Sequence, residues 1–377
     1  MNIIKSKAAV LYEIGLDKPY KKSKPLKIQE VDIYPPGPEE VLVQIKAAGL
    51  CHSDLSVING NRPRPVPMAI GHEGSGIIKE VGSKVKNFQT GDHVVFIFVP
   101  PCGSCLECKE GKPSLCISGL AANTAGTLLS GERRIKFNGN YINHHVGVSC
   151  FSEYAVVSTR SIVKIDKRVK FEEAAVFGCA VITGAGAVFN TAKIRPGAAV
   201  AVIGLGGTGI AALLGAKAAG ASKIIGIDLV KEKLDLAKIL GADLVLNPSL
   251  ENTSDEVIKN TNGGVDYSFE CVGSVSTMEL GYKLIKRGGM LVSSGLSHPS
   301  KSFSIQHVDL VAGEKIIKGS FLGSCIPDRD IPSYIQMYQK GIFPINNIMS
   351  NFIDLEDIND SLDLLDEGKT VRQIIRF

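Results

Sequence analysis

Residues 198–228 read AAVAVIGLGGTGIAALLGAKAAGASKIIGID, and this stretch determines the fold that we expect for the second half of the chain. A continuous apolar run is followed by the glycine-rich turn Gly204–Gly209, a segment of helical composition and a second apolar run. Asp228 ends that second run, nineteen residues after Gly209. A strand, a G-x-G-x-x-G turn, a helix and a terminal acid are together typical of a dinucleotide-binding unit.

The glycines and the acid have separate expected roles at a dinucleotide. Glycines let the backbone approach the pyrophosphate, and the helix that follows presents free N–H groups to it. These glycines are Gly204, Gly206, Gly207 and Gly209. Asp228 should bind the adenosine ribose and repel a 2′-phosphate, which favours NAD over NADP. The alternative is that Asp228 only caps the helix that follows. Lys233 is a further candidate at the ribose, although a lysine on a helix is more often solvated.

Two domains are expected, because 377 residues exceed the size of about 250–300 residues at which single cores stop growing. Around the glycine turn, strands and helices alternate, which predicts an α/β domain with a doubly wound parallel sheet over residues 181–320. The expected strands are 198–203, 223–227, 243–246, 265–269 and 289–293, and the expected helices are 209–219, 230–240 and 277–285.

Residues 1–180 have a different pattern. Short β-type runs are separated by Gly, Pro and Asp, which predicts an antiparallel β-rich domain with long loops. The clearest runs are 41–47, 76–81, 93–99 and 154–157. We expect the tail, residues 321–377, to return to this domain, with a short helix at 355–365.

The composition excludes several classes of protein. A formal net charge of +4, 44% hydrophobic residues and 21% charged residues describe an ordinary globular chain. No apolar run approaches the 18 or so residues of a membrane span. The first fifteen residues lack the apolar stretch behind a basic start that marks a secretory signal. We therefore expect a cytoplasmic protein with reduced thiols and with neither a membrane nor a nucleic-acid partner.

Four cysteines lie within fifteen residues in the spacing C-x2-C-x2-C-x7-C; they are Cys102, Cys105, Cys108 and Cys116. Four thiolates can close a tetrahedron around zinc, and a closed ligand sphere is structural rather than catalytic. An iron–sulfur cluster also takes four cysteines, but Cys116 lacks the short spacing and the following proline of ferredoxin runs. Unliganded thiols are the remaining alternative. If zinc is bound here, any chemistry has to come from residues elsewhere.

Three other candidate ligands are far apart in the sequence. Cys51 follows a β-type run, His72 follows a proline-rich loop, and Cys179 stands at the end of the first domain. A lone buried cysteine or histidine is more often a packed core residue than a metal ligand. The residues alone therefore leave this second site open.

The motifs taken together resemble one known family. GLCHSDL (Gly49–Leu55), GHEGSG (Gly71–Gly76), the four-cysteine loop, Phe177-Gly178-Cys179 and GLGGTG occur in the order and approximate separations of the zinc-dependent alcohol dehydrogenases of the medium-chain superfamily. The chain is similar to that family over essentially its whole length. The resemblance implies a GroES-like catalytic domain at residues 1–180 plus 321–377 and a Rossmann-type NAD-binding domain at 181–320. It also implies NAD and two zinc ions per chain, one catalytic and one structural.

The resemblance implies a role for each candidate residue around the catalytic zinc. The ligands are Cys51, His72 and Cys179, which leave a fourth position for water or the substrate oxygen. Asp54 and Glu73 stand behind them, and Ser53 begins a proton relay. Family members commonly end this relay with a histidine where the chain has Ser56, so we expect solvent to complete it. The implied contacts of the cofactor are His52 and Arg372 at the pyrophosphate and Thr183 and Phe321 beside the nicotinamide.

The implied substrate is a primary or secondary alcohol, oxidised to an aldehyde or ketone. Phe98 matches a position that lines the apolar substrate channel of the family. The alternative is S-(hydroxymethyl)glutathione dehydrogenase, whose members hold glutathione with an aspartate and an arginine where this chain has Arg62 and Leu120. Arg62 could select an anionic substituent or could be a solvated surface arginine. We assign Arg62, Phe98 and Leu120 to the substrate pocket, and we favour a general alcohol dehydrogenase over the glutathione-linked activity.

Two further expectations follow from the same resemblance. The long segment between Cys116 and Tyr154 resembles the typically dimeric members of the family, which implies a homodimer. His144 and His145 within it are expected to be exposed rather than to form a third metal site. The alternative from another class is a non-enzymatic, NAD-binding structural protein, and the presence of all three catalytic ligands favours the enzyme.

Overall fold

The computed structural model describes residues 2–250 and 252–377, and these form two compact units. The first unit comprises Met1–Cys179, Ile326–Pro332 and Met349–Phe377. The second comprises Ala180–Cys325 and Ser333–Ile348. Ala180 and residues 321–325 and 333–348, which we expected in the first domain, therefore group with the second unit.

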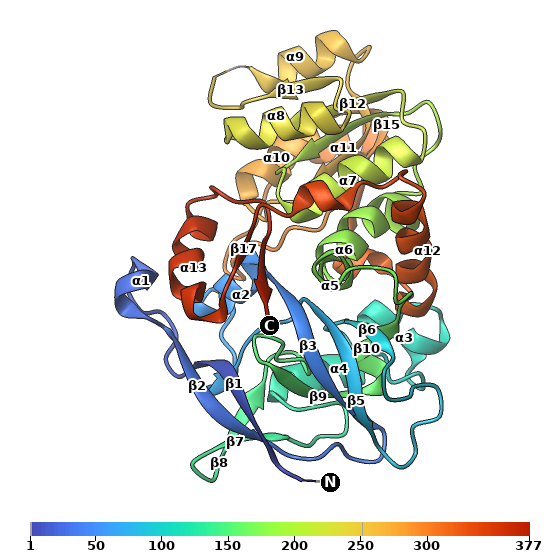
Figure 1. The fold of residues 1–377 in the computed structure, drawn as a ribbon. Coiled ribbons are helices and arrows are strands. Elements are labelled where there is room, and N and C mark those ends of the chain that lie inside the picture. Colours follow the sequence, from blue (N-terminus) through green and yellow to red (C-terminus); the bar gives the residue numbers. More distant parts are fainter. Residues whose placement is uncertain (1, 251) are drawn as a thin grey trace. The chain divides into compact units, whose positions relative to one another are not determined.

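The first unit is built from β-strands, in agreement with the pattern of short β-type runs. A closed barrel has the order β1-β2-β7-β8-β4, and Figure 1 shows β1, β2, β7 and β8 side by side. Its strands are β1 (Ile4–Leu11), β2 (Leu26–Ile33), β4 (Met68–Ala69), β7 (Ile135–Phe137) and β8 (Asn140–His144). A second sheet has the order β10-β6-β5-β3-β18-β17, with β9 also paired to β3. Its strands are β3 (Glu40–Leu50), β5 (Gly74–Val81), β6 (His93–Phe96), β9 (Tyr154–Ser158), β10 (Ile162–Lys164), β17 (Asn351–Ile353) and β18 (Gln373–Arg376).

Strand β3 organises this second sheet. It pairs with β5 along one edge and with β9 and then β18 along the other, so its backbone is hydrogen-bonded on both sides. Only two of its eleven residues, Gln44 and Lys46, are not buried, which matches the apolar run in the sequence. Because β18 is the last strand of the chain, the C-terminus belongs to the first unit.

Short helices of the first unit lie between these strands. They are α1 (Tyr20–Ser23), α2 (His52–Ile58), α3 (Leu106–Lys109), α4 (Ile117–Ala125), α5 (Phe171–Ala175) and α13 (Ile358–Asp366). A further helix, α12 (Pro327–Gln339), contains Pro332, after which the chain passes into the second unit. Among the residues that the structure describes, no single helix is long and apolar enough to cross a membrane; the bent pair Phe171–Gly178 and Ala180–Ala192 meets the criteria of length and composition only together.

The second unit confirms the predicted doubly wound sheet. Its six strands are all parallel and have the order β13-β12-β11-β14-β15-β16. Counted from β11, this is the order 3-2-1-4-5-6 of a dinucleotide-binding fold. The strands are β11 (Ala199–Ile203), β12 (Lys223–Ile227), β13 (Leu244–Leu246), β14 (Val265–Glu270), β15 (Ile285–Ser293) and β16 (Ile316–Gly319).

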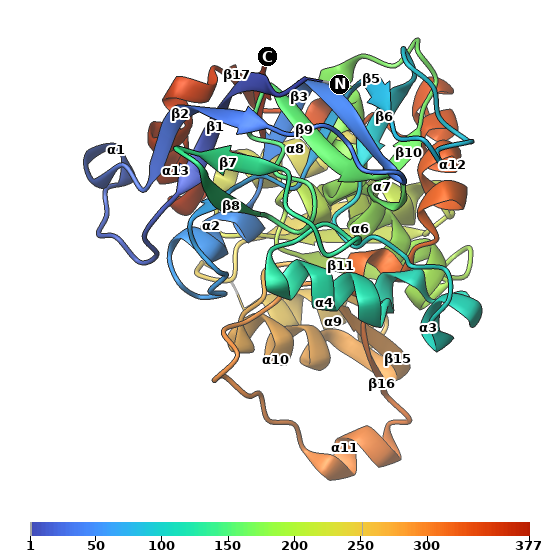
Figure 2. The same cartoon turned by 90° about the horizontal axis from the view of Figure 1, so that it is seen from below.

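Helices accompany the strands of this sheet, and Figure 1 shows α8 beside β12 and β13. They are α6 (Ala180–Gly186), α7 (Gly207–Ala218), α8 (Lys231–Leu240), α9 (Thr253–Asn260), α10 (Val275–Leu284) and α11 (His307–Ala312). Central strands with helices on both faces have no polar face, which explains the apolar sequence of β11. Strand β15 begins at Ile285, four residues before the predicted start, because a parallel partner, Val265 of β14, pairs with it there. Figure 2 shows α11 at the end of a long excursion between β15 and β16.

Candidate active site and metal centres

The structure brings together three residues that are far apart in the sequence. Cys51 lies at the N-terminus of α2, directly after β3; His72 lies in the loop between β4 and β5, and Cys179 directly follows a short 3-10 turn. All three side chains are buried, and their ligand atoms lie within 4.8 Å of one another. His72 Nε2 is 3.3 Å from the sulfur of Cys179. Two thiols and one imidazole in this arrangement fit a zinc ion that keeps one coordination position open.

Asp54 fixes the orientation of the imidazole. Its Oδ1 is 2.7 Å from His72 Nδ1, and its Oδ2 accepts a hydrogen bond from the backbone N–H of Cys51 at 3.1 Å. The carboxylate is fully buried. The contact with Asp54 leaves the Nε2 atom of His72 facing the sulfur of Cys179. A carboxylate that holds the second nitrogen of a ligating histidine is the usual outer support of a zinc site.

A glycine is required before the histidine. Gly71 has φ +102°, and a Cβ there would lie 2.5 Å from the backbone nitrogen of Phe151. Phe151 is itself completely buried in the core of the first unit. The motif Gly71-His72-Glu73 therefore places the imidazole by a turn that other residues would distort.

The two thiols of the site do not titrate alike. The hydrogen bond to Cys179 lowers the pKa of Cys51 well below its usual value, and the positive charge of Arg372 acts in the same direction. The same hydrogen bond, together with burial, raises the pKa of Cys179. The contact between the two sulfurs therefore favours the thiolate of Cys51, and a metal ion binds both sulfurs in their deprotonated form.

Glu73 and Arg372 form a buried pair beside these ligands. Nη1 of Arg372 is 3.3 Å from Oε2 of Glu73 and donates to the carbonyl of Leu50 at 3.0 Å. Both side chains are at least 95% buried. Arg372, directly before β18, thus brings a positive charge that acts on both sulfurs. The contact of Arg372 with the pyrophosphate, and that of the exposed His52, stay predictions.

The four-cysteine loop forms a second cluster. The four sulfur atoms of Cys102, Cys105, Cys108 and Cys116 lie within 4.8 Å of one another. Backbone N–H groups donate to two of these sulfur atoms. The N–H of Cys105 donates to the Sγ atom of Cys102 at 3.3 Å, and the N–H of Gly119 donates to the Sγ atom of Cys116 at 3.3 Å. Hydrogen bonds from Ser104 lower the pKa of Cys102 to about 5, whereas burial raises that of Cys108 to about 12. Four sulfur ligands in one loop fit a closed zinc sphere.

The glycine turn of the second unit connects β11 to α7. A Cβ at Gly209 would lie 1.7 Å from the carbonyl oxygen of Gly204, so the third glycine of the motif is needed for the turn to close. Helix α7 has Gly206 at its N-cap and no capping side chain, which leaves N–H groups for an anion. Asp228 accepts the N–H of Leu205 at 2.7 Å and that of Val230 at 3.0 Å. Its carboxylate therefore supports the turn, and its contact with the ribose stays a prediction.

Other predicted site residues differ in their surroundings. The Phe98 ring lies edge-on to the His72 ring, with 5.2 Å between centroids, which suits a pocket-lining role. Ser53 is half-buried in the first turn of α2, and Ser56 donates its hydroxyl to the carbonyl of His52 at 2.8 Å. Leu120 is 58% exposed on α4, and its place in the substrate pocket stays a prediction. In the second unit, Thr183 and Lys233 are half-buried and Phe321 is 39% exposed.

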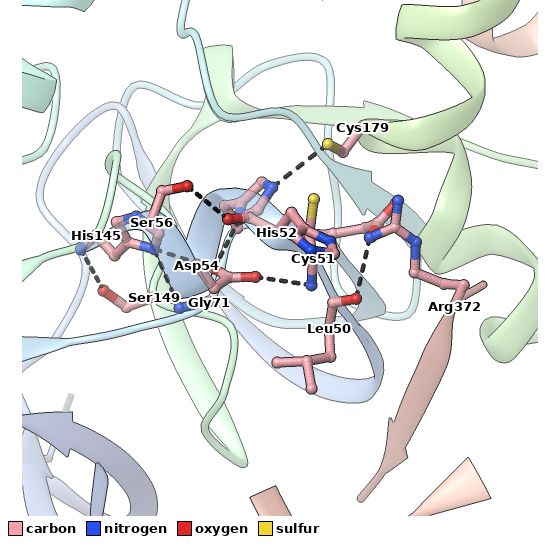
Figure 3. Close-up of polar contacts among 12 residues, drawn as sticks. Leu50, Cys51, His52, Asp54, Ser56, Gly71, His145, Ser149, Cys179 and Arg372 are labelled. Carbon is pink, nitrogen blue, oxygen red and sulfur yellow. Dashed lines mark hydrogen bonds and ion pairs between the residues drawn. The ribbon is translucent and has the colours of Figure 1, made fainter. Parts of the chain in front are cut away.

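The expectation that His144 and His145 are exposed is wrong. Both side chains are buried, and a backbone donor inside the fold reaches one ring nitrogen of each: the N–H of Arg134 donates to His144 Nε2 at 3.0 Å and the N–H of Gly71 to His145 Nδ1 at 3.1 Å. Figure 3 shows His145 beside Asp54; Nδ1 is 3.5 Å from Oδ1. Asp54, His72 and His145 form a group, but it shares His72 with the three-ligand centre and so belongs to the same site.

Comparison with known proteins supports the same assignment. Residues 37–167 match the family "Alcohol dehydrogenase GroES-like domain", and residues 207–340 match "Zinc-binding dehydrogenase". The S-(hydroxymethyl)glutathione dehydrogenase of Synechocystis is 38% identical over 99% of this chain and 100% of its own length.

The chain belongs to the zinc-dependent medium-chain alcohol dehydrogenases. Its structure is similar to that of benzyl alcohol dehydrogenase from Acinetobacter calcoaceticus, with a TM-score of 0.92, 34% identity and 99% of both chains covered. An alcohol dehydrogenase zinc-binding domain protein from Burkholderia ambifaria has a TM-score of 0.94 and 32% identity, with both chains fully covered. The chain is thus an oxidoreductase with NAD and zinc as cofactors, and the predicted family is confirmed.

Replacing Asp54 with Asn should weaken zinc binding at the three-ligand centre of this dehydrogenase. The amide is neutral and no longer stabilises the imidazole, so the affinity should fall about 10- to 100-fold. Competition of the purified protein with a chromogenic chelator measures this. Asp92→Asn, another buried carboxylate of the first unit, is the control. An unchanged affinity in the Asp54 variant would contradict the orienting role.

Replacing Cys105 with Ser should remove the structural zinc and leave the catalytic one. Elemental analysis should show one zinc per chain instead of two. The thermal midpoint should fall by about 5–10 °C, which corresponds to roughly 2–4 kcal/mol. Cys271→Ser, outside both clusters, should keep both ions. A variant with both ions lost at once would argue against independent sites.

Proposed function

We propose that this dehydrogenase oxidises primary or secondary alcohols to aldehydes or ketones with NAD⁺, and catalyses the reverse reduction. The observation that carries the proposal is the convergence of Cys51, His72 and Cys179 with Asp54 behind the imidazole. A zinc ion held there would supply Lewis-acid polarisation of the alcohol or carbonyl oxygen. NAD⁺ bound by the second unit would supply the acceptor for the hydride that leaves the carbinol carbon.

The residues of the chain supply orientation, charge and a path for the proton. Asp54 holds the imidazole, and the Arg372 guanidinium stabilises the thiolate of Cys51. Phe98 offers an apolar surface beside His72 for the carbon skeleton of the substrate. Ser53, half-buried in the first turn of α2 two residues after Cys51, would pass on the alcohol proton. A serine hydroxyl cannot act as a base near pH 7, and that of Ser56 donates to the carbonyl of His52, so the last proton transfer goes to solvent.

A second candidate is S-(hydroxymethyl)glutathione dehydrogenase, favoured by the name of the Synechocystis relative. Two observations weigh against it. Arg62 has the opposite charge to the aspartate that holds glutathione in that branch, and Leu120 is exposed and has no charge. The benzyl alcohol dehydrogenase of similar structure supports the first candidate.

We propose a cytoplasmic homodimer, formed through the edge of the parallel sheet. Strand β16 is the last strand of that sheet and, within the part of the chain that the structure describes, pairs only with β15, so its outer edge is open to a second copy. Exposed apolar side chains lie nearby in sequence: Val308 is 69% exposed, Val311 61% and Ile316 41%. Antiparallel pairing of two β16 strands would be self-complementary, as a two-fold interface requires.

The dimer proposal predicts that Lys318→Pro produces monomers. Proline removes a backbone donor from β16 and prevents edge pairing. Sedimentation velocity should show about half the wild-type mass, and Lys301→Pro, in a loop outside the strand, should leave the mass unchanged. A wild-type chain that sediments as a monomer would contradict the proposal.

The reaction itself is tested with the purified holoenzyme. NAD⁺ should be reduced with benzyl alcohol, and kcat/KM should exceed that for S-(hydroxymethyl)glutathione by about tenfold or more, equivalent to about 1.4 kcal/mol. Elemental analysis should find two zinc ions per chain. A preference for the glutathione adduct would establish the second candidate instead, and a chain with zinc that oxidises neither would leave the structural alternative.

Cofactor choice is tested by Asp228→Asn. Removing the charge removes the repulsion of a 2′-phosphate, so the ratio of kcat/KM with NADP⁺ to that with NAD⁺ should rise about tenfold. Asp228 also accepts two backbone N–H groups, so its replacement can weaken the use of both cofactors. The ratio of the two kcat/KM values cancels that common effect. Asp235→Asn, on the exposed face of α8, is the matched control. An unchanged ratio would mean that Asp228 only supports the turn.

A further inference from the structure

Two rare backbone conformations meet in the second unit. Helix α6 is followed directly by a π-helical turn, Ala187–Ala192, and the segment after β16 contains a left-handed turn, Leu322–Ser324. The φ angles of this left-handed turn are +49° at Leu322, +64° at Gly323 and +47° at Ser324. Left-handed backbone is costly for residues that carry a side chain, and π-turns frequently occur at functional sites. Such conformations persist only where the surrounding structure holds them.

Side chains of the π-helical turn hold the left-handed turn. Oγ1 of Thr191 lies 2.8 Å from Oγ of Ser320 and 2.9 Å from Oγ of Ser324, within hydrogen-bond distance of both. Nδ2 of Asn190 donates to the carbonyl of Gly323 at 3.2 Å. Thr191 and Ser320 are buried, and Ser324 is exposed. The single hydroxyl of Thr191 therefore joins the two ends of the segment Ser320–Ser324.

Helix α6 connects this turn to the dinucleotide motif through two glycines. A Cβ at Gly186 would lie 2.5 Å from the carbonyl oxygen of Gly323, in the left-handed turn. A Cβ at Gly184 would lie 2.1 Å from the carbonyl oxygen of Thr208, in the glycine turn that follows β11. Both contacts are possible only without a side chain at the glycine. Helix α6 thus lies in direct contact with the glycine turn and with the left-handed turn.

The left-handed turn lies at the edge of the sheet where a dinucleotide binds. All six strands are parallel, and in this fold each half of the sheet binds one nucleotide at the carboxyl ends of its strands. Asp228, expected at the adenosine ribose, directly follows β12, so the ends of β14, β15 and β16 belong to the nicotinamide half. Ser320 directly follows β16, and its N–H donates to the carbonyl of Ser293, at the end of β15, at 2.8 Å.

We propose that Thr191 is a positioning residue of the NAD site: its hydroxyl holds the left-handed turn, and this turn shapes the wall of the second unit that the nicotinamide ring contacts. Phe321, expected beside the nicotinamide, lies between the two serines that Thr191 joins. A segment fixed at both ends also fixes the backbone from which that ring projects. Thr191 itself acts through the turn and not on the cofactor. The inference rests on NAD as the cofactor and not on the identity of the alcohol.

The test compares two ligands that differ in the nicotinamide. ADP-ribose has the adenosine, the pyrophosphate and the second ribose of NADH, and it lacks the nicotinamide ring. Calorimetric titration of the zinc-loaded enzyme measures the Kd of each. Thr191→Val removes the hydroxyl and keeps a β-branched side chain. The Kd of NADH should rise about tenfold, as expected for two lost hydrogen bonds, while that of ADP-ribose should not change.

Three further variants separate positioning from a general loss of stability. Thr191→Ser keeps the hydroxyl and should keep the wild-type ratio of the two Kd values. Ser324→Ala removes one of the two contacts from the exposed end, so it should raise the Kd of NADH about threefold, and it decides the question if Thr191→Val does not fold. Thermal melts show whether each variant is folded.

The matched control is Thr261→Val. The Thr261 hydroxyl also makes two hydrogen bonds: it donates to the carbonyl of Val257 and accepts the N–H of Gly264 at 3.2 Å. Thr261 lies between α9 and β14, at the amino edge of the parallel sheet and away from the expected cofactor site. Its replacement should lower the thermal midpoint and leave both Kd values unchanged.

Binding decides this inference whether or not the enzyme oxidises the proposed alcohols. An equal loss of NADH and ADP-ribose binding in Thr191→Val would mean a general loosening of the second unit and would overturn the positioning role. Unchanged binding of both ligands would overturn it as well. Equal affinity of the wild type for NADH and ADP-ribose would do the same, because the turn would then hold no part of the nicotinamide. If neither alcohol is oxidised but NADH binding responds as expected, the proposed function fails and the role of Thr191 stands.

Discussion

The buried carboxylate of Asp54 is the contact on which the active centre depends. One oxygen holds the imidazole of His72 and the other accepts the backbone N–H of Cys51, so a single group positions two of the three ligands. A fully buried carboxylate costs several kcal/mol unless its partners compensate it. Burial raises the pKa of Asp54, and the opposing interaction with His72 counters that shift. The start of α2 and the loop before β5 are consequently fixed relative to each other.

The two metal centres differ in the way that the chain assembles them. The four-cysteine loop takes all its ligands from fifteen consecutive residues, so it can form locally and be sealed by its own thiolates. The three-ligand centre takes its ligands from the end of β3, the loop before β5 and the turn before α6. It exists only after the β-sheet of the first unit has formed. A centre with three protein ligands retains one position for a substrate, and the rigid sheet keeps that position open.

Local signals in the sequence predicted much of the fold. The order of strands and helices around Gly204–Gly209 could be deduced because buried parallel strands are continuous apolar runs and the turn is marked by glycine. The four-cysteine cluster was equally local. The set Cys51, His72 and Cys179 came only from the resemblance to a family, since His72 and Cys179 are 107 residues apart and no periodicity connects them.

Other features had no local signal at all. The burial of His145 depends on a backbone donor, Gly71, that is 74 residues away. The half-burial of Arg62 and Arg64 depends on the packing of their loop against α2 and α4, and nothing in the run Asn61–Pro65 distinguishes it from an exposed loop. Leu120 was assigned to the substrate pocket from its spacing after Cys116, but its side chain is exposed on helix α4. The direction of a side chain on a helix depends on its position in the helical period, which the spacing from Cys116 does not give.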